Sequence, residues 1–265
     1  MDIAGYSASI VIGIALGLIG GGGSILTVPV LVYLFRTDAV LATAYSLFIV
    51  GTTSAAGSVS YFRRGLVNLK TAAIFGVPSI AAVFLTRAHL VPAIPDTVFT
   101  LGGLVVNKGM LFMLLFAFLM VFASYSMIKK DPRTAEETKQ PQRFNYPLIV
   151  LEGSLVGVLT GLVGAGGGFL IIPALVLLSR LPMKEAVGTS LLIIAAKSLI
   201  GFLGERGTTA IDWTFLAVVT AFALGGLLIG TALAKRVDGE KLKPAFGWFV
   251  LAMGTYIIVK ETIIR

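Results

Sequence analysis

Two near-copies of one glycine-rich segment, each embedded in apolar sequence, constrain the fold of this chain most strongly. "GLIGGGGSILTVP" begins at Gly17 and "GLVGAGGGFLIIP" begins at Gly161, so the copies lie 144 positions apart. Ten of the eighteen positions from 17 to 34 are identical in the second copy. Two-fold internal repetition is the architecture of many secondary transporters. The chain is therefore expected to consist of two related halves.

The composition places both halves in a membrane. Of the 265 residues, 57% are hydrophobic and 13% are charged, whereas a soluble domain carries about 25% charged residues. Runs such as "FLAVVTAFALGGLLIGTALA" fit only in lipid or in a protein core within lipid. The excess of Lys and Arg, 21 against 13 acids, therefore does not imply nucleic acid, because cytoplasmic loops of membrane proteins collect basic residues.

A polar stretch, "KKDPRTAEETKQPQRFNY", separates the halves, since its Pro, Lys and Glu residues cannot form a lipid-facing span. We therefore divide the chain into an N-terminal transmembrane repeat (1–128), a linker loop (129–146) and a C-terminal transmembrane repeat (147–265). The register of 144 continues without a gap and pairs Ala42 with Ala186, Ser46 with Ser190, Ser54 with Ser198 and Gly57 with Gly201.

Each glycine-rich break divides an apolar segment in two. As one helix, residues 6–35 would be roughly 45 Å long, more than the ~30 Å hydrocarbon core requires. A break at 20–23 leaves arms of roughly 18–21 Å, each too short to cross alone. The segment is then either a long tilted helix with a kink or a re-entrant hairpin that returns to its starting side. Irregular backbone at membrane depth must be buried in protein or line a water-filled cavity.

The distribution of basic residues favours the hairpin. With one hairpin and three spans per half, 14 basic residues fall on one side of the membrane. Six fall on the other side, namely Arg36, Arg87, Lys108, Arg206, Lys260 and Arg265. If all eight segments span, the counts become about 11 and 8, without the clear bias that the positive-inside rule expects.

These observations predict an all-α polytopic membrane protein. It has two inverted repeats, each with a Gly-broken re-entrant hairpin plus three transmembrane helices. The linker loop is cytoplasmic and both termini face outward.

Two inverted hairpins would bring their tips together near the middle of the membrane. Half-helices beginning at Ser24 and Phe169 would direct free N–H groups and the positive ends of their dipoles toward the shared centre. Such ends bind anions without a charged side chain. The candidate binding residues at the tips are Gly22, Gly23, Ser24, Gly166, Gly167 and Gly168.

Lys197 lies in "SLLIIAAKSLIGF", in the middle of an apolar run. A cation at mid-span costs about 2.5–3.5 kcal/mol on insertion scales, so it usually faces a cavity or a partner. Ser190 shares its helix face, and Ser198 is adjacent in sequence. We expect all three to contribute to an anion site. The alternatives are a lysine that snorkels to the interface or one that pairs with Glu152.

In the first half, Thr53 occupies the position of Lys197, and Ser46 occupies that of Ser190. Both hydroxyl groups could donate to an anion, or they could bond back to a carbonyl one turn earlier or pack between helices. Gly57 and Gly201 are expected to permit close helix crossing.

Glu152 is the acid that lies clearly inside apolar sequence. It is a candidate proton-coupling carboxylate, with a counter-ion role or an interfacial position as alternatives. Asn68 and Asp212 correspond at the same offset, each before a predicted span, and are expected to be N-caps. His89 is expected in an exposed loop.

Enzyme motifs have no support in this sequence. It has no cysteine and one histidine, so it offers no metal-ligand cluster of the usual kind. The "GAGGG" run lacks the Lys-Ser/Thr of a phosphate-binding loop. We expect no catalytic residue, cofactor or metal.

The two motifs end at Pro29 and Pro173 and are followed by "ATAYSL" or "AVGTSL". They resemble the sulfite exporter TauE/SafE family, also called TSUP, over most of the chain. The resemblance implies a multi-pass transporter of the bacterial inner membrane that works by alternating access. Its cargo would be a small sulfur-containing anion moved outward, such as sulfite, thiosulfate or a short organosulfonate like sulfoacetate. A H⁺- or Na⁺-coupled anion importer and a non-transporting membrane scaffold are the alternatives, and a homodimer is an open possibility.

Overall fold

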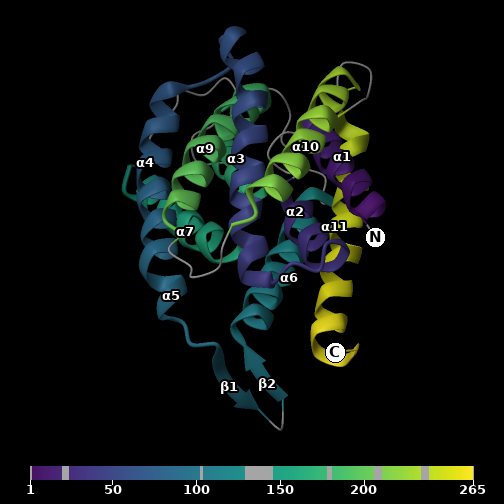
Figure 1. The fold of residues 1–265 in the computed structure, drawn as a ribbon. Coiled ribbons are helices and arrows are strands. Elements are labelled where there is room, and N and C mark those ends of the chain that lie inside the picture. Colours follow the sequence, from purple (N-terminus) through teal and green to yellow (C-terminus); the bar gives the residue numbers. More distant parts are fainter. Residues whose placement is uncertain are drawn as a thin grey trace.

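The computed structural model describes residues 2–19, 24–101, 104–128, 146–177, 181–205, 211–233 and 239–264, which are mostly helical (Figure 1). Gly22, Gly23 and linker residues 129–145 lie outside the described residues. The helices are α1 (Asp2–Ile19), α2 (Thr27–Pro29), α3 (Ala39–Arg63), α4 (Leu69–Leu85), α5 (Val91–Ala93), α6 (Lys108–Ile128), α7 (Tyr146–Val163), α8 (Gly168–Leu177), α9 (Met183–Leu203), α10 (Trp213–Leu233) and α11 (Gly239–Val259). Stretches of π-helix follow α2 (Val30–Leu34), α4 (Thr86–Leu90) and α11 (Lys260–Ile264).

Five of the described helices are long and apolar enough to cross a membrane, which confirms a multi-pass membrane protein. They are Ala39–Arg63, Leu69–Ala93, Lys108–Tyr125, Lys184–Leu203 and Trp213–Leu233. Within these helices, α9 and α3 bury most of their surface inside the protein, 72% and 61%, against 33–44% for the other three. The two therefore form the centre of the molecule, with α4 and α7 on one side and α1 and α10 on the other (Figure 1).

The first broken segment is a hairpin. Phe35, after the second arm, packs against the start of the first arm, with its ring centroid 5.4 Å from that of Tyr6. A Cβ added at Gly5 would lie 2.5 Å from Phe35 Cζ. The chain thus returns to where it began, as a single tilted helix would not. The first arm begins at Asp2, four residues earlier than the sequence indicated.

Helices that are equivalent by the offset of 144 run antiparallel. A Cβ at Gly51 of α3 would lie 2.8 Å from Leu199 Cγ of α9, and one at Gly201 would lie 3.6 Å from Leu47 Cδ1. Contacts thus move backward along α9 as they move forward along α3. The helices α6 and α11 are the last of the two halves, although the offset of 144 does not relate them, and they are also antiparallel: Gly254 faces Met120 and Gly247 faces Met127.

Contacts between the halves occur in matched pairs. The backbone of α1 at Gly13 approaches the carbonyl oxygen of Ala223 in α10. At the two positions that the offset of 144 relates to these, α7 approaches α4 in the same way. A Cβ at Gly157 would lie 2.5 Å from the carbonyl oxygen of Ser79. Only glycine permits backbones to come this close. The repeat in the sequence therefore corresponds to repeated packing in space.

The predicted N-caps are confirmed and are also matched. Asn68 Oδ1 accepts a hydrogen bond from Thr71 N at 3.0 Å, and Asp212 Oδ1 accepts one from Phe215 N at 2.9 Å. The backbone N–H group of each cap also donates to a helix of the other half. Asn68 N donates to Thr189 Oγ1 of α9, and Asp212 N donates to Tyr45 Oη of α3.

Two features between α4 and α6 differ from the sequence expectation. The helix of α4 continues through π-helical residues and α5, so that His89 is exposed as expected but lies on a helix and not in a loop. A two-stranded antiparallel hairpin, β1 (Thr97–Leu101) and β2 (Leu104–Asn107), follows, as a small addition to the all-α architecture.

Candidate functional site

The second glycine-rich break is a tight loop that only glycine can form. Gly164, Gly166 and Gly167 have φ values of 76°, 66° and 70°, in the left-handed region. A Cβ at Gly164 would lie 2.6 Å from Thr43 Cα of α3, so side chains are excluded there by space as well. The loop ends at Gly168, where α8 begins, one residue before the predicted start. Free N–H groups of the first turn of α8 therefore point back into the loop.

The two broken segments meet. Ser24, the first described residue after the first break, donates a hydrogen bond from Oγ to the carbonyl oxygen of Ala165 at 2.6 Å. A Cβ at Gly166 would also lie 3.5 Å from Ser24 Cβ. Ser24 and Ala165 are both buried. The structure therefore brings Ser24 together with Ala165 and Gly166, so the two tips meet as the sequence predicted.

Lys197 reaches this junction. Its side chain is 0% exposed, and Nζ donates to Thr160 Oγ1 of α7 at 2.9 Å. A Cβ at Gly167 would lie 2.7 Å from Nζ and 2.5 Å from Thr160 Oγ1. The ammonium group thus lies directly beside the loop that leads into α8. Among the described residues it makes no ion pair, which rules out the interfacial and counter-ion alternatives in this conformation.

Thr160 was not singled out from the sequence. It lies in the apolar run before the second break, where a single threonine resembles a helix-packing residue. Its position 37 residues before Lys197 gives no hint of a contact, because the contact depends on the long side chain of Lys197 reaching from α9 to α7, a helix that packs mainly against α4.

The hydroxyl groups near Lys197 differ in their availability. Thr53 donates its proton to the carbonyl oxygens of Ile49 and Val50, so it follows the back-bonded alternative. Ser198 is fully buried, and its Oγ has no hydrogen-bond partner among the described residues. An unsatisfied hydroxyl of this kind costs free energy unless a ligand or water supplies a partner.

Ser46 and Ser190 lie further away. Ser190 precedes Lys197 by seven residues, or about 10 Å along α9, and donates to the carbonyl oxygen of Val187 at 2.8 Å. Ser46 lies at the matching position of the antiparallel α3, and its buried Oγ has no partner among the described residues. Neither serine makes a hydrogen bond with Lys197 in this conformation.

Glu152 is half-buried on α7, eight residues and about 12 Å before Thr160. Its Oε2 is buried without a hydrogen-bond partner in the described part of the chain. The carboxylate therefore lies away from Lys197 along the axis of α7.

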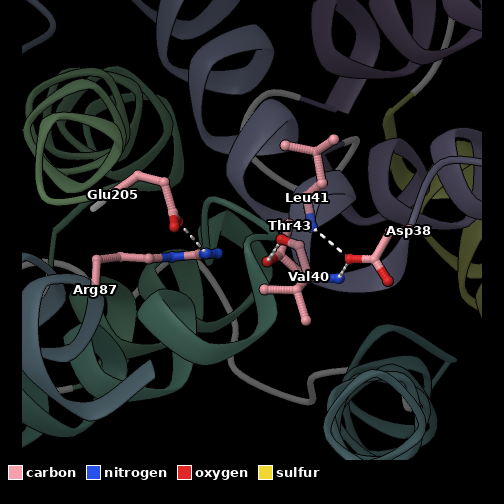
Figure 2. A network of polar contacts seen from close by, with 6 residues as sticks. All are labelled: Asp38, Val40, Leu41, Thr43, Arg87 and Glu205. Carbon is pink, nitrogen blue, oxygen red and sulfur yellow. Dashed lines mark hydrogen bonds and ion pairs between the residues drawn. The ribbon is translucent and has the colours of Figure 1, made fainter. Parts of the chain in front are cut away.

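A buried ion pair was missed from the sequence. Arg87 was expected among exposed charges, but it is 0% exposed and its Nη1 donates to Glu205 Oε2 at 3.0 Å. Figure 2 shows its side chain directed toward the first turn of α3, where Asp38 caps the helix. The expectation was wrong because the helix of α4 continues to Ala93, which carries Arg87 along the end of α9.

No group of three or more potential metal ligands occurs among the described residues. The junction brings together the N-terminus of α8, several hydroxyl groups and the amino group of Lys197, which are chemical groups that can donate hydrogen bonds.

The sequence profile of the sulfite exporter TauE/SafE family matches residues 6–257, nearly the whole chain. The chain belongs to this family. A probable membrane transporter protein of Xylella fastidiosa (strain 9a5c) is 33% identical over 257 residues, which cover 93% of this chain and 91% of the relative. The probable membrane transporter protein YunE of Bacillus subtilis (strain 168) is 28% identical over 273 residues, covering 94% and 97%. No solved structure matches the chain. This member of the TauE/SafE family is therefore a multi-pass membrane transporter.

Proposed function

We propose that the chain is a secondary transporter that exports a small sulfur-containing anion across the bacterial inner membrane. The position of Lys197 carries this proposal. It is a fully buried cation whose one polar partner among the described residues is the neutral Thr160. A charge inside a membrane protein is costly without compensation. A bound anion supplies that compensation.

The surroundings of Lys197 suit a compact oxyanion with one or two negative charges. The first turn of α8 contributes free N–H groups and the positive end of the helix dipole. Ser198, the next residue of α9, has a buried hydroxyl without a partner among the described residues, and Ser24 borders the loop. Sulfite, thiosulfate and the sulfonate of sulfoacetate present three acceptor oxygens to such donors. These donors can bind such an anion without a metal or cofactor, and the activity that we propose is transport.

Alternating access follows from an inverted-repeat arrangement, which we propose for residues 1–128 and 147–265. The antiparallel course of α3 and α9 supports it, because a two-fold axis that exchanges antiparallel helices lies in the membrane plane. The hairpin formed by residues 2–35 supports re-entrant segments. With the linker 129–146 cytoplasmic, both termini face outward. One repeat moving against the other would expose the Lys197 site to each side in turn.

The membrane potential supplies the direction. An inside-negative potential favours the exit of an anion by about 2.3 kcal/mol per charge per 100 mV. Export therefore requires no coupling ion.

Thermal-shift measurements on the purified protein test the binding proposal. Sulfite, thiosulfate and sulfoacetate are compared with taurine and sulfate as anions or zwitterions of related shape. We expect at least one of the sulfur oxyanions to raise the melting temperature, and Lys197→Met to abolish that response. Lys184→Ala removes an exposed lysine from the same helix and should leave it intact. If no anion shifts the protein, or if Lys197→Met responds like the native chain, the proposed site is wrong.

Coupled import is a second candidate, favoured by the unsatisfied Oε2 of Glu152. In proteoliposomes, export by potential alone needs no pH gradient, and Glu152→Gln leaves it unchanged. Coupled import requires an inward proton gradient and is lost with Glu152→Gln.

A further inference from the structure

The structure is asymmetric where the sequence repeat predicts symmetry. Gly57 on α3 and Gly201 on α9 are equivalent positions, and each faces an apolar side chain of its partner helix. A Cβ at Gly201 would lie 2.9 Å from Val83 Cγ2 of α4, so α4 and α9 are tightly packed. A Cβ at Gly57 would lie 3.8 Å from Leu227 Cδ1 of α10, an ordinary contact distance. The expectation of close crossing therefore holds at Gly201 and is wrong at Gly57.

A pocket of about 510 Å³ occupies the looser interface, between α3 and α10. Its polar lining residues are Ser60 of α3, Arg64 directly after α3, and Thr231 of α10. The rest of the lining is Gly57 and apolar side chains, among them Leu227. Arg64 gives this end of the molecule a positive charge that attracts anions.

The equivalent place between α9 and α4 is filled. Gly204, at the C-terminal end of α9, is the repeat equivalent of Ser60, and a Cβ on it would lie 3.1 Å from the carbonyl oxygen of Phe84. Arg87 is the repeat equivalent of Thr231. It is completely buried and forms an ion pair with Glu205. Because α3 and α9 are antiparallel, the pocket and the ion pair lie at opposite ends of the helix bundle.

Arg87 has more donors than Glu205 uses. A guanidinium group has five N–H donors in a fixed planar fork. Nη1 donates to Glu205, whereas Nε and Nη2 are buried and have no hydrogen-bond partner among the described residues. The fork matches the geometry of two oxygens of an oxyanion. A buried arginine in this state is half-satisfied, and a second anionic ligand would complete it.

We propose that Arg87 is a second oxyanion-binding residue of the pathway and that Glu205 shields it in this conformation. This inference rests on the proposed transport of an anion past Lys197. Gly204 lies seven residues after Lys197, so Arg87 is about 10 Å further along α9. When α4 separates from α9 as α10 is separated from α3 here, the anion reaches Arg87 and takes the place of Glu205. Closure of the pair then prevents its return.

Single-cysteine labelling tests the proposal, because the native chain has no cysteine. Ala88 and Ala232 are equivalent positions, and Ala88 is 6% exposed whereas Ala232 is exposed beside the pocket. In purified protein, Ala232→Cys should react readily with water-soluble methanethiosulfonates and Ala88→Cys slowly. Adding Glu205→Gln to Ala88→Cys should raise its reaction rate at least about tenfold. The sulfonate-bearing reagent should gain several-fold more than the trimethylammonium reagent.

The matched control is Ala88→Cys with Arg87→Gln and Glu205→Gln together. It removes both charges and keeps a polar side chain at each position, so the pair is open but has no anion preference. The proposal would be overturned if the preference for the sulfonate reagent over the trimethylammonium reagent were the same with and without Arg87. It would also be overturned if Glu205→Gln did not change the labelling rate of Ala88→Cys. Slow labelling of Ala232→Cys would also overturn it, because the pocket would then face lipid. Lys197→Met should leave the preference at position 88 unchanged, so failure of the central anion site is scored separately by the thermal shift.

Discussion

Ser24 Oγ lies 2.6 Å from the carbonyl oxygen of Ala165, to which it donates a hydrogen bond. The two residues are 141 positions apart, and each belongs to one of the glycine-rich segments. This buried bond ties the two irregular segments to each other, where bilayer lipid could not satisfy their polar groups.

Ser24→Ala should therefore loosen the junction. The carbonyl oxygen of Ala165 loses a buried donor, and we expect a loss of about 1 kcal/mol of stability. The melting temperature of the purified protein reports it. Ser154→Ala is the control, because Ser154 donates to a carbonyl of its own helix near the surface and should change little. An unchanged melting temperature for Ser24→Ala would mean that the bond does not hold the segments together.

Gly167→Ala should damage the anion site more than the fold. The left-handed backbone costs a non-glycine residue roughly 1–2 kcal/mol. The new Cβ would also lie 2.7 Å from Lys197 Nζ and push the ammonium group away from Thr160.

Gly65→Ala is the matched control for Gly167→Ala. Gly65 has φ 68° and nothing within 4 Å of an added Cβ, so it pays the backbone cost alone. Both variants should melt earlier than the native protein, but only Gly167→Ala should lose the anion-induced thermal shift. A normal shift in Gly167→Ala would place the anion elsewhere.

The helix crossing of α1 and α10 gives a comparison of two neighbouring glycines. Gly226 faces α1, where an added Cβ would collide with the carbonyl oxygen of Ile10, whereas Gly225 has open space around it. Gly226→Ala should destabilise the protein strongly or prevent its folding. Gly225→Ala should be neutral or slightly stabilising, because alanine is favoured over glycine within helices by up to about 1 kcal/mol. Size-exclusion profiles and melting temperatures of the two variants check this difference, and equal behaviour would contradict the packing.

Much of the fold could be predicted because the sequence repeats its own constraints. The offset of 144 paired the two breaks and the two N-caps at Asn68 and Asp212, and the apolar run around Lys197 indicated its central position. These features depend on local chemistry: a glycine loop, a capping side chain and a cation in an apolar run. Each needs only residues close in sequence.

The features that were missed depend on contacts distant in sequence. Arg87 and Glu205 are 118 residues apart, and nothing near either residue signals the pair. Thr160 became part of the site because the side chain of Lys197 reaches from α9 to α7. The difference between Gly57 and Gly201 is conformational, and two equivalent glycines in one sequence cannot record it.

The membrane orientation of the chain is the last expectation that can be tested directly. The positive-inside count predicts that the linker 129–146 is cytoplasmic and that the β1–β2 hairpin is on the outer side. Thr138→Cys in the linker and Asp96→Cys before β1 are suitable single-cysteine reporters, and Asp96 is exposed. In intact cells, an impermeant maleimide should label Asp96→Cys and leave Thr138→Cys unlabelled until the membrane is permeabilised. The opposite pattern would invert the orientation, so Arg64 and the pocket between α3 and α10 would face outward and the structure would be open toward the outside. Labelling of both reporters from one side would contradict an odd number of spans between them, and with it the inverted relation of the two repeats.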